Sequence, residues 1–561
     1  MRSSAYEDKK MGNTSSPFRP WLVKLPLKLH SAANLLLLLS SSLFGFSSCF
    51  GGSSIAVICG WIFAIALANF FSQVKKPDLV LLWLTGLLLY YSSGYWIVEV
   101  ISQFTNCSFV TALSLSFVLF SLLALQFVFC GLLVRKIDRG WIARSNLALP
   151  ISWLLLELFF PQFFPWRLAT GQLAWQSFAI ISSIAGLPFL SFVMLWVATR
   201  IVNRQLKQLA TSLIVFTGML ILGDQMRHET EKTINQSPTL MIGMVQGNIP
   251  PEHNAITASN SERLERYQAL SASLLKSQPR IELLLWPESS SGHDYPDNVK
   301  SITRGSIADP LPAFDVPLFF GGETLYQRYD DKSSNDRQYT QYFTSLRLLE
   351  PDGQISQRYD KEIRFPFVET MLPGWQYINP RHYQILRGDN KDAITLPLKE
   401  SNLTNGLQIV PAICYEDLFD SIFVSQLTNH SVEGMPAVLV VASNESWFLS
   451  SAALKIHHGL AAWRAVETGK YLVRITNNGL SSVISPLGET VFTLPVNQEA
   501  SGSYAVPLLR QRTLFSKISF TTIPSLLGAL LISLFPIAIS NRHETRGSLL
   551  KRKRRNRKDQ A

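Results

Sequence analysis

The chain has 561 residues, 47% of them hydrophobic, and its mean hydropathy of +0.15 exceeds that of an ordinary soluble protein. This composition excludes a wholly soluble fold and predicts that part of the chain lies in lipid. The formal net charge of +11 points to an anionic partner, which is either nucleic acid or a membrane surface.

Long apolar runs with few charges predict eight membrane-spanning helices, seven of them before residue 225. The first run lacks a cleavage site and is followed by further spans, which favours a span over a signal peptide. The fifth is short and carries Glu157 and Pro161, so we expect it to be bent or partly buried in protein. The predicted spans are 31–49, 53–72, 79–98, 109–134, 147–164, 173–199, 207–224 and 516–540.

Lysine and arginine gather in alternate loops, which predicts that the N-terminus and the C-terminal tail lie in the cytoplasm and the large polar segment outside it. The tail "KRKRRNRK" resembles a nucleic-acid patch, but a basic run beside a span is more simply a topology anchor that contacts anionic lipid. We therefore predict a cytoplasmic segment (1–30), a seven-span membrane domain (31–224), an external domain (225–515), an eighth span (516–540) and a basic cytoplasmic tail (541–561).

The external segment has mixed charges, turn signals such as "PDG" and "NNG", and short β-rich runs that alternate with helical stretches. This pattern predicts a mixed α/β domain. The expected helices are 258–276, 416–428 and 452–468, and the expected strands are 240–246, 281–286, 318–326, 342–350, 407–413, 437–443 and 470–476.

The external segment contains a single cysteine, Cys414, at the end of the strand-like run "LQIVPAI". Considered alone, such a cysteine is more often a small buried hydrophobic residue than a nucleophile. A thiol that attacks an acyl carbon needs a base and a group that stabilises the oxyanion. His457 and His458 lie in a helical run and fit surface or packing roles better than the role of base.

Two charged residues supply those needs. Glu288 in "WPE" follows a buried-strand pattern, at the point where α/β folds place their chemistry, although a glutamate there is often only a loop charge. Lys361 in "YDK" precedes the aromatic stretch "RFPF", which favours a partly buried cation over a surface charge.

The order Glu288, Lys361, Cys414 resembles the Glu-Lys-Cys triad of the nitrilase (carbon–nitrogen hydrolase) superfamily. Together with the predicted spans, it identifies the chain as similar to the bacterial apolipoprotein N-acyltransferase family. The stretches "MVQGNIP", "SNESWF", "RAVETGKYLVRITNNG" and "FPW" also match. The chain departs from the family at Glu445, where an aspartate is common, and in the absence of an aromatic residue after "QGNIP".

The resemblance implies a polytopic α-helical membrane domain joined to an external αββα sandwich. It implies that Glu288 moves the proton of Cys414 and that Lys361 and the Tyr415 backbone N–H stabilise the oxyanion. Supporting or substrate-binding roles are implied for Glu369, Tyr415, Glu416, Asn444 and Trp447.

The resemblance also implies the substrates. Cys414 would take an acyl chain from a phospholipid as a thioester and pass it to the α-amino group of a diacylglyceryl-modified N-terminal cysteine of an apolipoprotein. The implied location is the bacterial inner membrane, with the catalytic domain facing the periplasm. The resemblance implies no nucleic-acid partner, and a monomer is favoured. Neither a metal-ligand spacing nor a nucleotide motif is present, so no metal or cofactor is predicted.

Two other functions stay open at this stage. The same triad would serve a membrane-tethered amidase that uses water as the acceptor, because fold alone does not separate the two reactions. A scaffold or transporter is disfavoured because the predicted spans carry few charges suited to a substrate path.

Overall fold

The computed structural model describes most of residues 32–518. Residues 1–31 and 519–561 lie outside the described part, as do the internal segments 49–51, 74–76, 251–259, 300–310, 331–337, 371–382, 398–405 and 430–433 and a few single residues. The eighth span predicted at 516–540 and the basic tail therefore fall almost entirely outside the described residues.

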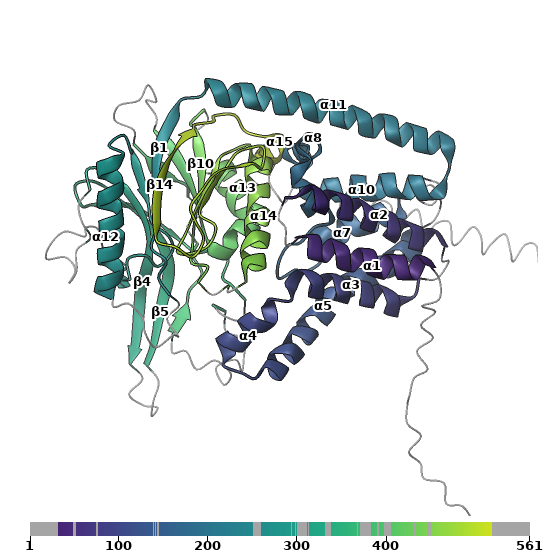
Figure 1. Cartoon of the computed structure of the whole chain (residues 1–561), viewed down its shortest axis with the longest axis horizontal. Coiled ribbons are helices and arrows are strands. Elements are labelled where there is room, and N and C mark those ends of the chain that lie inside the picture. Colours follow the sequence, from purple (N-terminus) through teal and green to yellow (C-terminus); the bar gives the residue numbers. More distant parts are fainter. Residues whose placement is uncertain are drawn as a thin grey trace, which may run out of the picture.

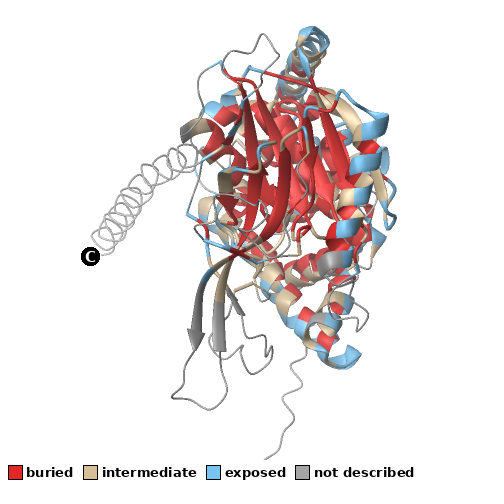
Figure 2. Cartoon of the chain, turned by 90° about the vertical axis from the view of Figure 1, so that its left-hand side faces the viewer, coloured by how far each residue is buried: buried red, intermediate tan, exposed pale blue. Residues whose placement is uncertain are grey.

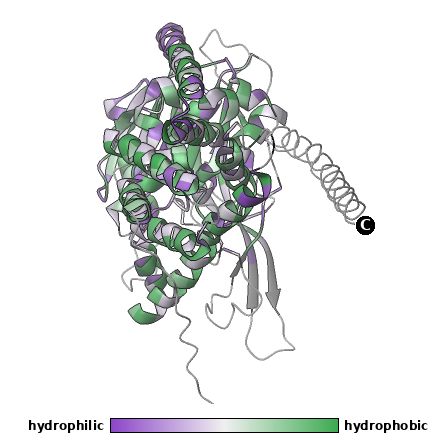
Figure 3. Cartoon of the chain, turned by 90° about the vertical axis from the view of Figure 1, so that its right-hand side faces the viewer, coloured by the Kyte–Doolittle hydropathy of each residue, from purple (hydrophilic) through white to green (hydrophobic). Residues whose placement is uncertain are grey.

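A helical domain forms one end of the molecule (Figure 1). Figure 3 looks onto this end, where hydrophobic ribbon predominates. Its helices are α1 (Ala32–Ser47), α2 (Ser54–Gln73), α3 (Leu79–Gly94), α4 (Ile97–Thr105), α5 (Phe109–Ile137), α7 (Ala148–Phe159), η2 (Leu168–Ala174), α8 (Gln176–Ala179), α9 (Ser182–Ala185), α10 (Leu187–Asn203) and α11 (Leu206–Gln236).

Within the described residues, three helices (α2, α5 and α11) are long and apolar enough to cross a membrane, and α3 with α4 forms a fourth candidate that is bent by 66°. The remaining apolar helices are shorter. Large hydrophobic side chains on α5 and α11 are exposed, as expected for surfaces that face lipid. The structure thus contains several candidate spans, but it does not confirm the predicted number of eight.

The predicted span at 173–199 is wrong in form, because the chain there is broken. Residues 168–185 form η2, α8 and α9, and a continuous helix begins only at Leu187. Gly186 adopts a φ of +80°, a left-handed conformation that glycine tolerates and that ends α9. A hydropathy window does not register such a break because the segment 173–199 is largely apolar and carries no charged residue.

The short fifth helix, α7, carries its charge inside the protein as expected. Glu157 is buried and accepts hydrogen bonds from the Trp153 indole N–H at 2.7 Å and from the Leu168 backbone N–H at 2.8 Å. These donors compensate for part of the cost of burying the carboxyl group.

Two sheets make up the second domain (Figure 1). Among the described residues, the first sheet has the order β14-β1-β2-β4-β5-β6, with β3 beside β4 and β7 beside β5, and the second has the order β13-β12-β11-β10-β9-β8. The strands are β1 (Thr239–Gln246), β2 (Leu283–Leu285), β3 (Asp294–Pro296), β4 (Leu318–Asp330), β5 (Gln338–Leu349), β6 (Ile355–Asp360), β7 (Tyr383–Ile385), β8 (Ile394–Leu396), β9 (Leu407–Ile413), β10 (Ala437–Ser443), β11 (Leu472–Thr476), β12 (Ser482–Ile484), β13 (Thr490–Thr493) and β14 (Ala500–Pro507).

The sheets pack face to face with helices outside them, as an αββα sandwich requires. One apolar cluster joins the two sheets, and a second joins the first sheet to α12 (Asn260–Ser277). The outer face of the second sheet is covered by α13 (Asp420–Asn429) and α14 (Ser451–Thr468). Figure 2 shows the sheets as the most deeply buried part of this domain. All seven predicted strands of the external domain are present, as are the helices predicted at 258–276 and 452–468. The helix predicted at 416–428 begins only at Asp420, because a separate 3₁₀ turn precedes it.

Helices α13 and α14 also pack against the helical domain, because one continuous apolar cluster runs from α1–α10 into these two helices and the second sheet. Polar contacts fix the junction. The Trp463 indole N–H donates to the Thr170 carbonyl at 3.0 Å, and the Leu187 backbone N–H donates to Glu467 Oε1 at 3.0 Å. The sandwich is therefore held firmly against the helices that enter lipid.

Candidate active site

Cys414 occupies a strained turn at the end of a buried strand. All seven residues of β9 are buried, and the chain passes directly from Ile413 into the 3₁₀ turn η4 (Cys414–Leu418). Cys414 has a φ of +51°, a left-handed conformation that costs a non-glycine residue about 1–3 kcal/mol. Such strain persists only where the surrounding structure enforces it, and here it sets the direction of the thiol.

Glu288 emerges shortly after β2 and is buried. Its Oε2 accepts the Asn444 backbone N–H at 2.8 Å, and its Oε1 lies 3.5 Å from Lys361 Nζ. A Cβ atom added to Gly321 would lie 2.6 Å from the Glu288 Cα atom, so the close approach of β4 requires glycine there. Contacts on several sides thus hold Glu288.

Lys361 follows β6 and is only 1% exposed. Its ammonium group lies 2.7 Å from Glu369 Oε1 in addition to the contact with Glu288. Glu369 is fixed in turn, because its Oε2 accepts the Phe365 backbone N–H at 2.6 Å. One buried cation is therefore shared between two carboxylates.

Burial and charge set the protonation states of this group. Burial raises the pKa of Glu288, although Lys361 opposes the shift. Burial also raises the pKa of the Cys414 thiol, and the negative charge of Glu288 adds to the effect. For Lys361, burial alone would lower the pKa, but Glu369 and Glu288 outweigh it and raise the pKa well above its ordinary value. The ground state is thus a neutral thiol beside a permanently charged ammonium group.

Glu416 lies under the cysteine turn and is fully buried. Its carboxyl group accepts the Ile413 backbone N–H at 2.7 Å, the Ile363 backbone N–H at 2.8 Å and the Tyr359 hydroxyl at 3.0 Å. Burial raises its pKa to about 7. Glu416 therefore ties the turn that carries the thiol to the segment that carries Lys361.

The side chain of Tyr415 points to the helical domain. Its hydroxyl donates to the Phe163 carbonyl, and its ring packs against Phe365 at 5.0 Å and against Phe163 and Phe164 at 6.0 Å between ring centroids. An aromatic wall thus connects the residue after the thiol with the chain segment that follows α7.

Two family models match the chain. The model described as the apolipoprotein N-acyltransferase N-terminal domain matches residues 34–199, and the carbon-nitrogen hydrolase model matches residues 241–510. Curated relatives named apolipoprotein N-acyltransferase include one from Shewanella oneidensis, 25% identical over 70% of this chain and 75% of the relative. Another, from Vibrio parahaemolyticus, is 24% identical over 79% of this chain and 84% of the relative.

The chain belongs to the apolipoprotein N-acyltransferase family. Among solved structures, it is similar to Nit3 of Saccharomyces cerevisiae, a member of branch 10 of the nitrilase superfamily. That similarity has a TM-score of 0.33 and 15% identity, and it covers 48% of this chain and 90% of the yeast protein. An amidase from Nesterenkonia sp. gives a TM-score of 0.32 at 14% identity, over 53% of this chain and 97% of that one.

Membership in the apolipoprotein N-acyltransferase family makes the chain an acyltransferase of a bacterial membrane, and it leaves the amidase alternative less supported. No described group of three or more histidine, cysteine, aspartate or glutamate side chains could hold a metal ion. The fold expected from the sequence, a polytopic helical domain joined to a nitrilase-like sandwich, is confirmed.

The structure brings most of the predicted site residues of this apolipoprotein N-acyltransferase together. Asn444 contacts Glu288 through its backbone, while its side-chain carbonyl accepts the Asn477 amide at 3.2 Å. Trp447 and Phe367, the last residue of the aromatic stretch "RFPF", lie outside the described residues. Phe163 was not predicted, although the neighbouring "FPW" motif pointed to this segment.

Of the two roles that the sequence left open for His457, the structure shows the packing role and not the surface role. His457 is only 3% exposed and lies between Asp417 and Glu445. Sequence spacing gave no sign of this contact because its partners come from distant turns of the second sheet.

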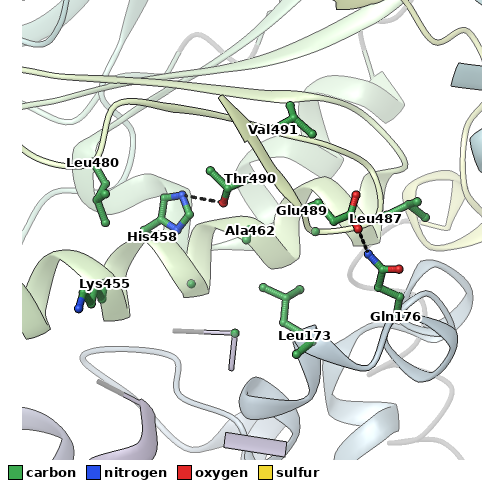
Figure 4. A pocket seen from close by; sticks show the side chains of 14 residues that line it. Leu173, Gln176, Lys455, His458, Ala462, Leu480, Leu487, Glu489, Thr490 and Val491 are labelled. Atoms are coloured by element: carbon green, nitrogen blue, oxygen red, sulfur yellow. Dashed lines mark hydrogen bonds between the residues drawn. The ribbon is translucent and has the colours of Figure 1, made fainter. Parts of the chain in front are cut away.

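His458, in contrast, lines a cavity of about 670 Å³ between α14 and the helical domain (Figure 4). Its Nε2 lies 3.1 Å from the Ser482 hydroxyl, and burial lowers its pKa to about 4, so the ring is neutral. Gln176 and Glu489 form a hydrogen bond across this cavity. Cys414, Glu288 and Lys361 do not line it, so the cavity is separate from the candidate active site.

Proposed function

We propose that the chain transfers an acyl chain from a membrane phospholipid to the α-amino group of a diacylglyceryl-modified N-terminal cysteine of apolipoproteins, with Cys414 as nucleophile. The observation that carries the proposal is the packing of Lys361 between the buried Glu288 and the partly buried Glu369, beside a cysteine whose neighbour, Tyr415, contacts the helical domain. The contacts of Lys361 beside the cysteine fit acyl transfer. The contact of Tyr415 with the helical domain fits an acyl donor that stays in the bilayer.

In the first half-reaction, Glu288 accepts the thiol proton as the Cys414 sulfur attacks the ester carbonyl. The raised pKa of Glu288 suits a base that has to take a proton from a poorly acidic thiol. Lys361 and the Tyr415 backbone N–H stabilise the oxyanion. The ester C–O bond breaks, Glu288 returns the proton to the leaving alkoxide, and a lysophospholipid departs from the thioester.

In the second half-reaction, the lipoprotein amine attacks the thioester carbonyl and passes a proton to Glu288. The C–S bond breaks, an amide forms, and the thiolate recovers the proton from Glu288. A covalent intermediate of this kind predicts ping-pong kinetics. Both substrates are anchored by chains whose removal from a bilayer costs about 0.8 kcal/mol per CH₂ group, so a catalytic domain held at the membrane reaches them without that cost.

The orientation belongs to the same proposal. Lysine and arginine in alternate loops place the N-terminus in the cytoplasm and the sandwich in the periplasm of an inner-membrane protein.

The decisive experiment is mass spectrometry of the full-length protein after incubation with phospholipid alone. We expect an acyl mass on the peptide that contains Cys414, and its transfer to a diacylglyceryl-cysteine peptide added afterwards. The Cys414→Ser variant is the control and carries no thioester. If release of free fatty acid is unaffected by the peptide and the peptide stays unmodified, the amidase-like alternative with water as acceptor is correct instead.

A further inference from the structure

A buried charge cluster lies behind the candidate active site. It consists of Asp417, Glu445, His457 and Arg474, and three of these side chains are completely buried while His457 is 3% exposed. Arg474 Nε donates to Asp417 Oδ2 at 3.0 Å, and Arg474 Nη2 donates to Glu445 Oε1. His457 Nε2 lies 2.7 Å from Asp417 Oδ1, and its Nδ1 lies 2.9 Å from Glu445 Oε1.

This geometry favours a doubly protonated His457 ring. Each ring nitrogen faces a carboxylate oxygen, and only an imidazolium donates from both nitrogens. In a neutral ring with the proton on Nε2, Nδ1 could accept from Arg474 Nη2, which lies 3.1 Å away, but its lone pair would then face Glu445 Oε1 at 2.9 Å. Two cations and two carboxylates make the buried charge cluster neutral as a whole.

The pKa directions agree with this assignment. Burial and the positive charge of Arg474 each lower the pKa of His457, but Asp417 outweighs them, with a further contribution from Glu445, so the pKa is raised. Burial would raise the pKa of Glu445, yet Arg474 and His457 hold it well below its ordinary range. His458, the next residue on the same helix, has a pKa lowered to about 4 and is neutral.

The buried charge cluster joins the elements that carry the reacting groups. Asp417 belongs to η4, three residues after Cys414, and Glu445 directly follows Asn444, whose backbone N–H holds Glu288. His457 comes from α14 and Arg474 from β11. A Cβ atom on Gly479 would lie 1.7 Å from Glu445 Oε2, so the loop after β11 also closes tightly on the cluster.

We propose that His457, as an imidazolium, is a positioning residue for acyl transfer: it neutralises Asp417 and Glu445 and so holds the Cys414 turn and the Asn444 loop in register with Glu288. This inference rests on the proposed function of Cys414. Without the imidazolium, Arg474 alone balances the two buried carboxylates of the cluster. The repulsion between these carboxylates then moves the Cys414 thiol relative to Glu288.

The test compares His457→Gln with His457→Gln/Glu445→Gln in full-length protein, by the rate of acyl-enzyme formation from phospholipid vesicles. His457→Gln leaves one excess negative charge in the buried charge cluster. We expect the rate of acyl-enzyme formation to fall by about 10–100-fold, the range found at metal sites when a residue that orients a ligand is removed. The double variant is neutral again, so it should be faster than His457→Gln. His458→Gln, next to it on α14, is the matched control and should acylate at the wild-type rate.

A double variant as slow as His457→Gln or slower would overturn the inference, because a purely structural histidine predicts that the two losses add. Wild-type speed in His457→Gln would overturn it as well. Absence of the acyl-enzyme in wild-type protein would instead contradict the proposed function, so the two failures can be distinguished.

A second measurement does not depend on whether His457→Gln folds. Because the imidazolium is required, wild-type acylation should fall as pH rises through the raised pKa of His457. Glu445→Gln removes one of the charges that raise this pKa, so the alkaline limb should move to lower pH. An unchanged alkaline limb in Glu445→Gln would overturn the inference.

Discussion

The Tyr415 hydroxyl donates a hydrogen bond to the backbone carbonyl of Phe163, which joins the residue after the candidate nucleophile to the helical domain. Because the Tyr415 ring also packs against Phe163, Phe164 and Phe365, the turn that carries Cys414 is attached to both domains at once.

Tyr415→Phe tests this attachment, since it keeps the ring and removes the hydroxyl. A hydrogen bond contributes about 0.5–1.5 kcal/mol, so we expect acyl-enzyme formation to slow by about two- to tenfold with a small drop in melting temperature. Tyr415→Ala, which also loses the ring contacts, should be slower still. Identical rates for Tyr415→Phe and wild type would show that the hydroxyl plays no part.

Lys361→Ala removes the only described cation between Glu288 and Glu369. We expect acylation to fall by at least about 10²–10³-fold, the usual effect of losing one oxyanion donor. Stability should also fall by about 3–5 kcal/mol at neutral pH, because the buried Glu288 and the partly buried Glu369 lose the cation that they share. Intact-protein mass spectrometry and thermal unfolding measure the two effects, and a stable, active variant would contradict the assigned role.

Substitutions at Cys414 separate a nucleophile from a buried hydrophobic residue. Cys414→Ser should fold normally and form no thioester, because a serine hydroxyl is far less acidic than a thiol. Cys414→Gly should be inactive but melt above Cys414→Ala, since glycine adopts a φ of +51° without strain. An active Cys414→Ser of reduced stability would favour the structural role.

The pH dependence of acylation should show an acid limb set by Glu288. Burial raises the pKa of this base, so its reactive, deprotonated form is lost as pH falls through a value above the ordinary glutamate range. Glu369→Gln removes a negative charge that raises the pKa of Glu288, and Lys361 then interacts with Glu288 as its single carboxylate partner in this group. The acid limb should therefore move to lower pH, even if the maximal acylation rate also changes. Single-turnover acylation rates measured across the pH range give this shift. If the acid limb of Glu369→Gln coincides with that of the wild type, a group other than Glu288 sets it.

The orientation can be tested with single cysteines and a membrane-impermeant thiol reagent. Because basic residues alternate between loops, a cysteine on the exposed surface of α12 should react in intact cells whose outer membrane is permeable, whereas one in the tail "KRKRRNRK" should react only after the inner membrane is opened. Labelling of the tail in intact cells would overturn the predicted topology.

Sequence patterns predicted the sandwich well, because buried strands such as β9 and β10 are continuous apolar runs with sharp ends. The same ends located Glu288 and Cys414, and the aromatic stretch after Lys361 indicated that this cation is buried. These features depend on neighbours in the chain, so the sequence displays them directly.

Other features depend on distant contacts and were not predictable. The sequence did not decide between a surface and a packing role for His457, because its partners, Asp417 and Arg474, are 40 and 17 residues away. The break near Gly186 was missed because it lies among apolar residues, where hydropathy does not separate a continuous span from short helices packed inside the protein.

Helix α11 has 31 residues and runs without a break from beside α10 to Gln236, three residues before β1 begins (Figure 1). At 1.5 Å per residue it is about 46 Å long, longer than the roughly 30 Å hydrocarbon core of a bilayer. Its polar end is stiffened by ion pairs of Arg227 with Asp224 and Glu231. A continuous helix of this kind joins the sandwich to the helical domain as a rigid element. It does not bend or extend as a flexible linker would. Under the proposed function, the ester carbonyl of the phospholipid would then have to move to the thiol, because the thiol is carried on a rigidly connected domain.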